Sequence, residues 1–159
     1  MIAEADDSPS IDFASPANAP VLRFLGVSQP ELARTTLPAY ANGLALGTHP
    51  DLVEYFWELP AGIRIRCACV VNERSFPLLV NPGGIIFGLA GGTNTLAFRL
   101  PEPELSVALA VPGFGHEYRY PGKPLRAASI GGDWALVRPF DEGNVALCRL
   151  AFEHAATLG

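Results

Sequence analysis

Short apolar runs separated by tight turns fill the middle of the chain and constrain its fold more than any other feature. Between Ile63 and Val71, apolar residues alternate with other residues, which is the period-two pattern of a strand with one buried face. Three more runs follow at 76–80, 85–89 and 95–100, and the links between the runs are rich in Gly, Asn and Pro. Parallel strands need crossovers of a dozen or more residues, so these short links predict an antiparallel meander.

Helical patterns flank these runs on both sides. Residues 50–58 place Pro50 and Asp51 in a first turn, with Thr48 as the candidate N-cap. The same helix gathers its apolar residues on one face: Leu52, Val53, Phe56 and Trp57. The capping-box pattern at 28–31 predicts an earlier helix.

Three further elements are expected in the second half of the chain. Residues 102–111 alternate like a strand, but their acidic start and their alanines favour a helix, which is the assignment we adopt. Strands are predicted around 115–120 and 134–138. A last helix is predicted to begin at Asp141, with one apolar face formed by Val145, Cys148, Phe152 and Ala155.

These elements predict an α+β fold: an antiparallel sheet of about five to six short strands, with N-terminal helices and a C-terminal helix packed on it. The 159 residues suit one domain, which we place at 21–159. Residues 1–20 are rich in Ala, Ser, Pro and Asp and read as a flexible or loosely docked acidic segment.

The charge distribution argues against nucleic acid as a partner. The net charge is −5, and four of the 16 acidic residues lie within the first twelve positions, which contain no base. The rest of the chain therefore carries 12 acidic against 11 basic residues and lacks a basic stripe that could follow a phosphate backbone. Ten of those bases are Arg and one is Lys123, a bias typical of a GC-rich bacterial genome.

Cysteine usage and the apolar runs predict a cytoplasmic protein. Three cysteines, an odd number, provide no disulfide framework. The first ten residues lack the basic start and apolar run of a signal peptide. Every apolar stretch is shorter than the roughly 20 residues that a membrane span needs, so no membrane association is expected.

The sequence predicts neither a cofactor nor a metal ion. The paired glycines at 83–84 and 91–92 lie between predicted strands with no Lys after them, which favours hairpin turns over a phosphate loop. His116 and Glu117 begin a zinc-helix pattern, but the second His that it requires is replaced by Tyr120. Ser129 comes one substitution short of a hydrolase nucleophile motif and is followed by a strand rather than a helix.

Two groups of residues are candidate binding sites. The aromatic residues at 55–57 cannot all face one way on a helix, so Tyr55 or Trp57 is expected to meet solvent or a partner. The second group is an edge formed near turns by polar residues that suit acid–base or ligand-binding work: His116, Glu117, Arg119 and Asp133.

Three functions remain open. The first is a non-enzymatic protein-binding domain, for example an immunity-type inhibitor that opposes its acidic groups to the basic cleft of a toxin. The second is a small enzyme or small-ligand-binding protein that uses the edge around His116, Glu117 and Asp133. The third is a self-assembling structural protein, so the expected partner is another protein or a second copy of this chain.

Overall fold

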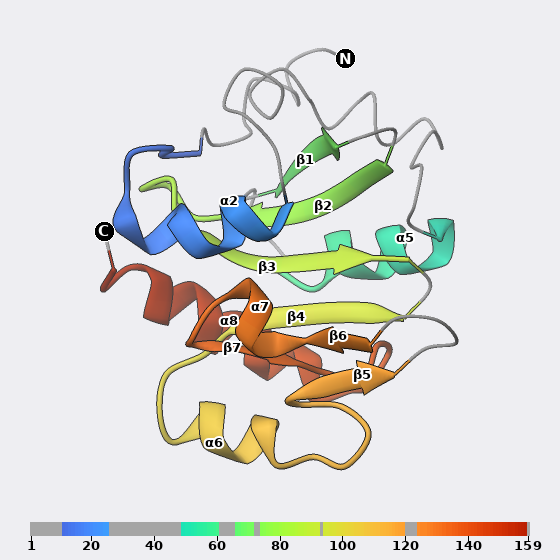
Figure 1. Ribbon diagram of the computed structural model, residues 1–159. Coiled ribbons are helices and arrows are strands. Elements are labelled where there is room, and N and C mark those ends of the chain that lie inside the picture. Colours follow the sequence, from blue (N-terminus) through green and yellow to red (C-terminus); the bar gives the residue numbers. More distant parts are fainter. Residues whose placement is uncertain are drawn as a thin grey trace.

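The computed structural model describes residues 11–25, 49–60, 66–71, 74–92, 94–119 and 124–158 and is built around a five-stranded antiparallel sheet (Figure 1). In their order across the sheet, the strands are β1 (Arg66–Val71), β2 (Arg74–Val80), β3 (Ile86–Gly91), β4 (Thr95–Arg99) and β7 (Trp134–Leu136). Strands β5 (Glu117–Arg119) and β6 (Pro124–Arg126) form a separate hairpin. The predicted meander and the α+β class are confirmed.

Helices cover both faces of this sheet. Figure 1 shows α2 (Ala19–Leu25) and α7 (Ala127–Ile130) in front of it and α5 (Pro50–Glu58) and α8 (Asn144–Ala155) behind it. The turn η1 (Pro16–Asn18) leads into α2, and α6 (Glu104–Leu109) packs beside β7. No helix within the described ranges is long and apolar enough to cross a membrane.

Each face of the sheet buries its own apolar cluster, because successive residues of a strand point to opposite sides. On β2, Leu78 belongs to the cluster under α2 and α7, whereas Leu79 belongs to the cluster under α5, α6 and α8. The β3 strand is buried along its whole length. Burial on both faces explains why the apolar run at 85–90 is nearly continuous.

Helix α5 matches the predicted span, but its N-cap differs from the sequence-based prediction. The cap residue is His49, whose Nδ1 accepts a hydrogen bond from the Asp51 backbone N–H at 3.0 Å. An imidazole nitrogen can accept this bond as a Ser or Thr oxygen does, although pattern-based rules do not favour His at this position. Thr48 and the capping box at 28–31 lie outside the described residues.

Helix α6 confirms the helical assignment within 102–111, and α8 corrects the prediction for the last helix. Helix α8 begins at Asn144 rather than Asp141, because a turn comes first: the Gly143 N–H donates to Asp141 Oδ1 at 3.1 Å. Its buried face consists of Asn144, Cys148, Ala151 and Ala155. Val145, predicted on the apolar face, is instead 56% exposed.

Part of the N-terminal segment lies against the sheet. Residues 1–10 lie outside the described part of the chain, whereas Ile11 and Asn18 are buried. The backbone N–H of Asp12 donates to the Gly84 carbonyl at 3.0 Å, in the turn between β2 and β3. This contact joins the start of the described chain to the middle of the meander.

Candidate functional site

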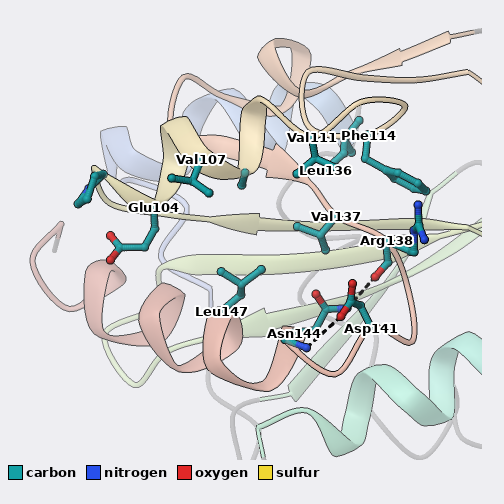
Figure 2. Close-up of a pocket in the computed structure, with 13 residues that line it drawn as sticks. Glu104, Val107, Val111, Phe114, Leu136, Val137, Arg138, Asp141, Asn144 and Leu147 are labelled. Carbon is teal, nitrogen blue, oxygen red and sulfur yellow. Dashed lines mark hydrogen bonds between the residues drawn. The ribbon is translucent and has the colours of Figure 1, made fainter.

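A largely apolar cavity of about 520 Å³ lies between α6, β7 and the start of α8. Figure 2 shows Val107 on α6 facing Leu147 on α8 across it, with Val137 between them. Phe114 and Arg138 lie toward one end and Glu104 toward the other. Both the volume and the apolar lining are typical of a ligand-binding pocket.

The orientation of α6 determines which of its side chains line the cavity. Leu105 and Ala108 point into the core, so the helical period leaves Val107 on the opposite, outward side at 69% exposure. The first turn of the helix is held by Glu102, whose Oε1 accepts hydrogen bonds from the backbone N–H (3.2 Å) and the hydroxyl (2.6 Å) of Ser106. The buried contacts of Leu105 and Ala108 therefore hold α6 in an orientation in which Val107 forms part of the cavity wall instead of packing in the core.

The floor of the cavity contains a polar network centred on Asn144, which is 2% exposed. Its Nδ2 donates to the Arg138 carbonyl and to the Tyr55 hydroxyl, both at 2.8 Å. The Tyr55 hydroxyl in turn donates to the Asp141 carbonyl at 3.1 Å. Burial raises the pKa of the Tyr55 phenol, so this donor keeps its proton at neutral pH.

The charges around the cavity are mixed. Glu104, Arg138 and Asp141 are among its lining residues. The Arg138 guanidinium lies over the Phe114 ring, 5.3 Å from its centroid, in a cation–π arrangement. The Asp141 carboxylate accepts the Gly143 N–H at the start of α8, where the helix dipole favours a negative charge.

Four large apolar side chains of the described residues are exposed, and each belongs to a residue that lines this cavity or is next in sequence to one that does: Val107, Val111, Phe140 and Val145. Val107 and Val111 line it. Phe140 and Val145 are next in sequence to the lining residues Asp141 and Asn144, and the centroid of the Phe140 ring lies 4.6 Å from that of the Tyr55 ring. We call these four residues the apolar rim.

The structure separates the two predicted binding aromatics. Tyr55 reaches the cavity floor through Asn144, so it belongs to the site although it is not a lining residue. Trp57 is partly buried and packs against the core cluster under α5, next to the Phe56 ring at 5.4 Å. Phe56 itself is fully buried.

The predicted polar edge is divided between two different sets of partners. Glu117 lies in the β5–β6 hairpin, with its Oε1 3.3 Å from Arg126 Nε. His116 is exposed, and its carbonyl accepts the Ala127 N–H at 2.8 Å. The side chain of Arg119 lies outside the described part of the structure.

Asp133 belongs instead to an ion cluster beneath α8. Its Oδ2 lies 3.2 Å from both Arg99 Nε and His154 Nε2. Arg99 is nearly fully buried, and it also donates to the carbonyls of Ile86, at 3.1 Å, and Ala17. Burial lowers the pKa of Arg99 and the Asp133 carboxylate opposes that shift, which is typical of an ion pair with a structural role.

Metal and thiol chemistry find little support among the described residues. They contain no group of three or more His, Cys, Asp or Glu side chains placed to hold a metal ion. Cys148 lies on the buried face of α8, and burial raises the pKa of its thiol to about 12. A thiol that stays protonated at neutral pH is a poor nucleophile.

The sequence analysis missed most of the cavity because three separate segments build it. Residues from 103–114, 136–138 and 141–147 meet only in the folded chain. One signal was present: 102–111 alternates like a strand, so as a helix it carries apolar residues on two sides, more than one buried face requires.

Comparison of the chain with protein-family models, with curated proteins and with solved structures found no match.

Proposed function

We propose that this chain is a non-enzymatic protein-binding domain whose partner covers the apolar rim and inserts an apolar group into the cavity between α6, β7 and α8. The observation that carries this proposal is the position of the rim. Exposed apolar side chains are usually scattered singly over a protein surface, whereas here two of the four large ones, Val107 and Val111, line one cavity, and the other two are next in sequence to residues that line it.

The exposure of the rim favours a protein over a small molecule. A small ligand within the cavity would leave Phe140 and Val145, which are 55% and 56% exposed and do not line it, in contact with water. A protein surface would cover them together with the cavity, which matches an interface that has an apolar centre and a polar surround. Within this class, an immunity-type inhibitor of a toxin is the specific function that we propose.

The test is copurification from cells with a tagged chain and a matched pair of variants. Val107→Asp places a charge on the rim at an exposed position, so it should leave the fold intact and remove the partner. Ala128→Asp makes the same kind of change at an exposed position of α7, on the opposite face of the sheet, and should retain the partner. The proposal fails if Val107→Asp retains every stoichiometric partner of the wild type.

A small enzyme or ligand-binding protein centred on Asp133 is the second candidate. The observation that favours it is the 3.2 Å contact between Asp133 Oδ2 and His154 Nε2, since a carboxylate that orients an imidazole is a common acid–base arrangement. A metabolite screen by thermal shift, repeated with His154→Gln, tests this candidate. A ligand that stabilises the wild type and the variant equally does not use this pair.

A further inference from the structure

The two ends of the cavity differ in charge. Figure 2 shows Glu104 at one end and Arg138 with Asp141 at the other. At the second end, the Asp141 carboxylate offsets the Arg138 cation, whose guanidinium lies over the Phe114 ring. Arg138 is the only base among the described residues that line the cavity. The end formed by Glu104 therefore carries a negative charge that no lining residue offsets.

The Glu104 carboxylate is also available for a new contact. It is half-buried in the first turn of α6, and within the described parts of the chain it makes no hydrogen bond or ion pair. The neighbouring Glu102 is engaged, because its Oε1 accepts two hydrogen bonds from Ser106. Water screens a half-buried carboxylate less than an exposed one, so a cation placed against Glu104 gains more than it would on the open surface.

The segments that build the cavity are acidic as a group. Residues 102–114 and 136–147 contain four acidic residues and one base, whereas the chain beyond position 12 is nearly balanced, with 12 acidic and 11 basic residues. A second copy of this chain would bring the same acidic surface against itself, which like charges oppose. A partner with basic groups around its apolar contact would be complementary instead.

The backbone at Phe140 supports a binding role for this face independently of the charges. Its φ is 68°, and no other non-glycine residue in the described ranges has a positive φ. This left-handed conformation is costly for a bulky side chain. The residue is 55% exposed, so burial in the core does not account for the conformation. Strain of this kind is concentrated at ligand-binding and other functional surfaces.

We propose that the partner protein presents to the cavity an apolar side chain flanked by a cationic one, Lys or Arg, and that this cation lies against Glu104. The inference rests on the proposed function and specifies the chemistry and the orientation of the inserted group. The apolar side chain lies between Val107 and Leu147, which face each other across the cavity (Figure 2). The cation lies at the end of the cavity opposite Arg138, where no like charge opposes it.

Two probes, phenylbutylammonium and phenylbutanol, test this proposal on the full chain by NMR titration at low salt. They share the same apolar body and differ in the end group, so the difference between their affinities reports on the charge. The ammonium probe should bind about threefold more tightly, as expected for one partly exposed ion pair. Equal binding of the two probes, or tighter binding of phenylbutanol, overturns the proposal.

A matched pair of variants locates the preference at Glu104. Glu104→Gln keeps the size of the side chain and removes its charge, so it should abolish the preference for the ammonium probe and leave the affinity for phenylbutanol unchanged. Glu153→Gln makes the same change at an exposed position of α8 that does not line the cavity, and it should keep the preference. If Glu104 serves only the dipole of α6, Glu104→Gln lowers the thermal unfolding midpoint without changing the preference, and the proposal is overturned.

Asp141→Asn tests the orientation. An Asn at this position still offers an Oδ1 acceptor to the Gly143 N–H, so the turn before α8 is kept while one charge is removed at the other end of the cavity. The preference for the ammonium probe should fall less in this variant than in Glu104→Gln. A larger fall in Asp141→Asn would place the cation at the wrong end and overturn the proposed orientation.

The outcomes separate this inference from the function on which it rests. Val107→Asp should weaken the neutral probe, because it changes the apolar wall. If both probes bind equally and Val107→Asp weakens phenylbutanol, the cavity accepts apolar groups without selecting a cation, so the inference fails while the proposed function stands. If neither probe binds, the inference also fails, and copurification with Val107→Asp still judges the proposed function independently.

Discussion

Asn18 lies fully buried between the N-terminal turn and the start of β3, where its side chain makes three hydrogen bonds. Its Nδ2 donates to the carbonyls of Asp12 and Gly84, both at 2.8 Å, and its Oδ1 accepts the Ile86 N–H at 3.0 Å. Asn18→Ala removes all three bonds: the Ile86 N–H loses this acceptor, whereas the Gly84 and Asp12 carbonyls keep only the backbone N–H groups of Asp12 and Ser15. We expect it to lower the free energy of unfolding, measured in urea, by about 3 kcal/mol.

Asn18→Asp serves as the control for this prediction. It preserves the shape of the side chain and an acceptor for the Ile86 N–H, but it turns a carboxylate oxygen toward two carbonyls. It should destabilise the fold at least as much as Asn18→Ala. A decrease in the free energy of unfolding of less than about 0.5 kcal/mol for either variant would show that these hydrogen bonds contribute little to stability.

The Cys148 thiol gives the protein a pH dependence in the alkaline range. Its pKa is about 12 in the folded chain because of burial, against an ordinary value of 9.0. Between these two values the unfolded chain loses the thiol proton while the folded chain retains it. This contribution to stability is therefore intact below pH 9 and falls as the pH rises toward 12, by about 1.4 kcal/mol per pH unit.

Urea unfolding of the wild type and of Cys148→Ala at pH 8 and pH 10.5 measures this effect. The variant should be less stable than the wild type at pH 8, by about 1 kcal/mol for the lost side-chain packing. At pH 10.5 the difference should shrink or reverse, because the variant has no buried thiol at this position to keep protonated. A stability difference that is the same at both pH values would contradict the assignment.

The segment between α6 and β5 turns at Gly115, whose φ is 65°. Its N–H donates to the Leu136 carbonyl at 2.9 Å and its carbonyl accepts the Leu136 N–H at 3.0 Å, which brings Phe114 to the cavity. A Cβ at this position would lie 2.5 Å from the Leu109 carbonyl oxygen and 2.6 Å from that of Ala108. These atoms are backbone at the end of α6, so the helix itself would have to move.

Gly115→Ala should therefore lower the free energy of unfolding by more than about 2 kcal/mol. Gly113 is the matched control, since its φ is 80° but a Cβ there would have no atom within 4 Å. Gly113→Ala should cost only the conformational penalty of about 1 kcal/mol. Similar thermal unfolding midpoints for the two variants would contradict this prediction, because they would show that the end of α6 can shift to accommodate a Cβ at little cost in stability.

At the scale of elements, patterns within one segment were predictable and contacts between segments were not. The strands around 76–80, 85–89 and 95–100 follow from local alternation and turn residues, and the structure confirms them to within a few residues. The later start of α8 was missed because it depends on the Asp141 turn, a local side-chain bond that competes with the helix.

At the scale of the whole molecule, long-range polar contacts join parts of the chain that no sequence pattern connects. Asp133 links Arg99 on β4 to His154 on α8, and Arg99 extends the connection to the Ala17 carbonyl near the N-terminus. Asn144 connects α8 to Tyr55 on α5, 89 residues away in the sequence. Composition and periodicity carry no information on such pairs, so the sequence predicted the class of the fold but not the cavity.

The size of the apolar rim bears on whether the partner is a different protein or a second copy of this chain. Standard interfaces bury about 20–30 residues on each side, and obligate dimers are more apolar still. The rim has four exposed large apolar residues, which is enough for the centre of a non-obligate interface and little for an obligate dimer. We therefore expect the purified chain to be a monomer of 16.9 kDa by light scattering at about 10 μM.

Val107→Asp makes that measurement discriminate between the two kinds of partner. If the protein binds another protein through the rim, the wild type and the variant are both monomeric and only the wild type gains mass when the copurified partner is added. If the rim instead joins two copies, the wild type has twice the monomer mass and Val107→Asp halves it, because paired rims would bring two carboxylates into one apolar interface. That second result would replace the proposed partner with the chain itself.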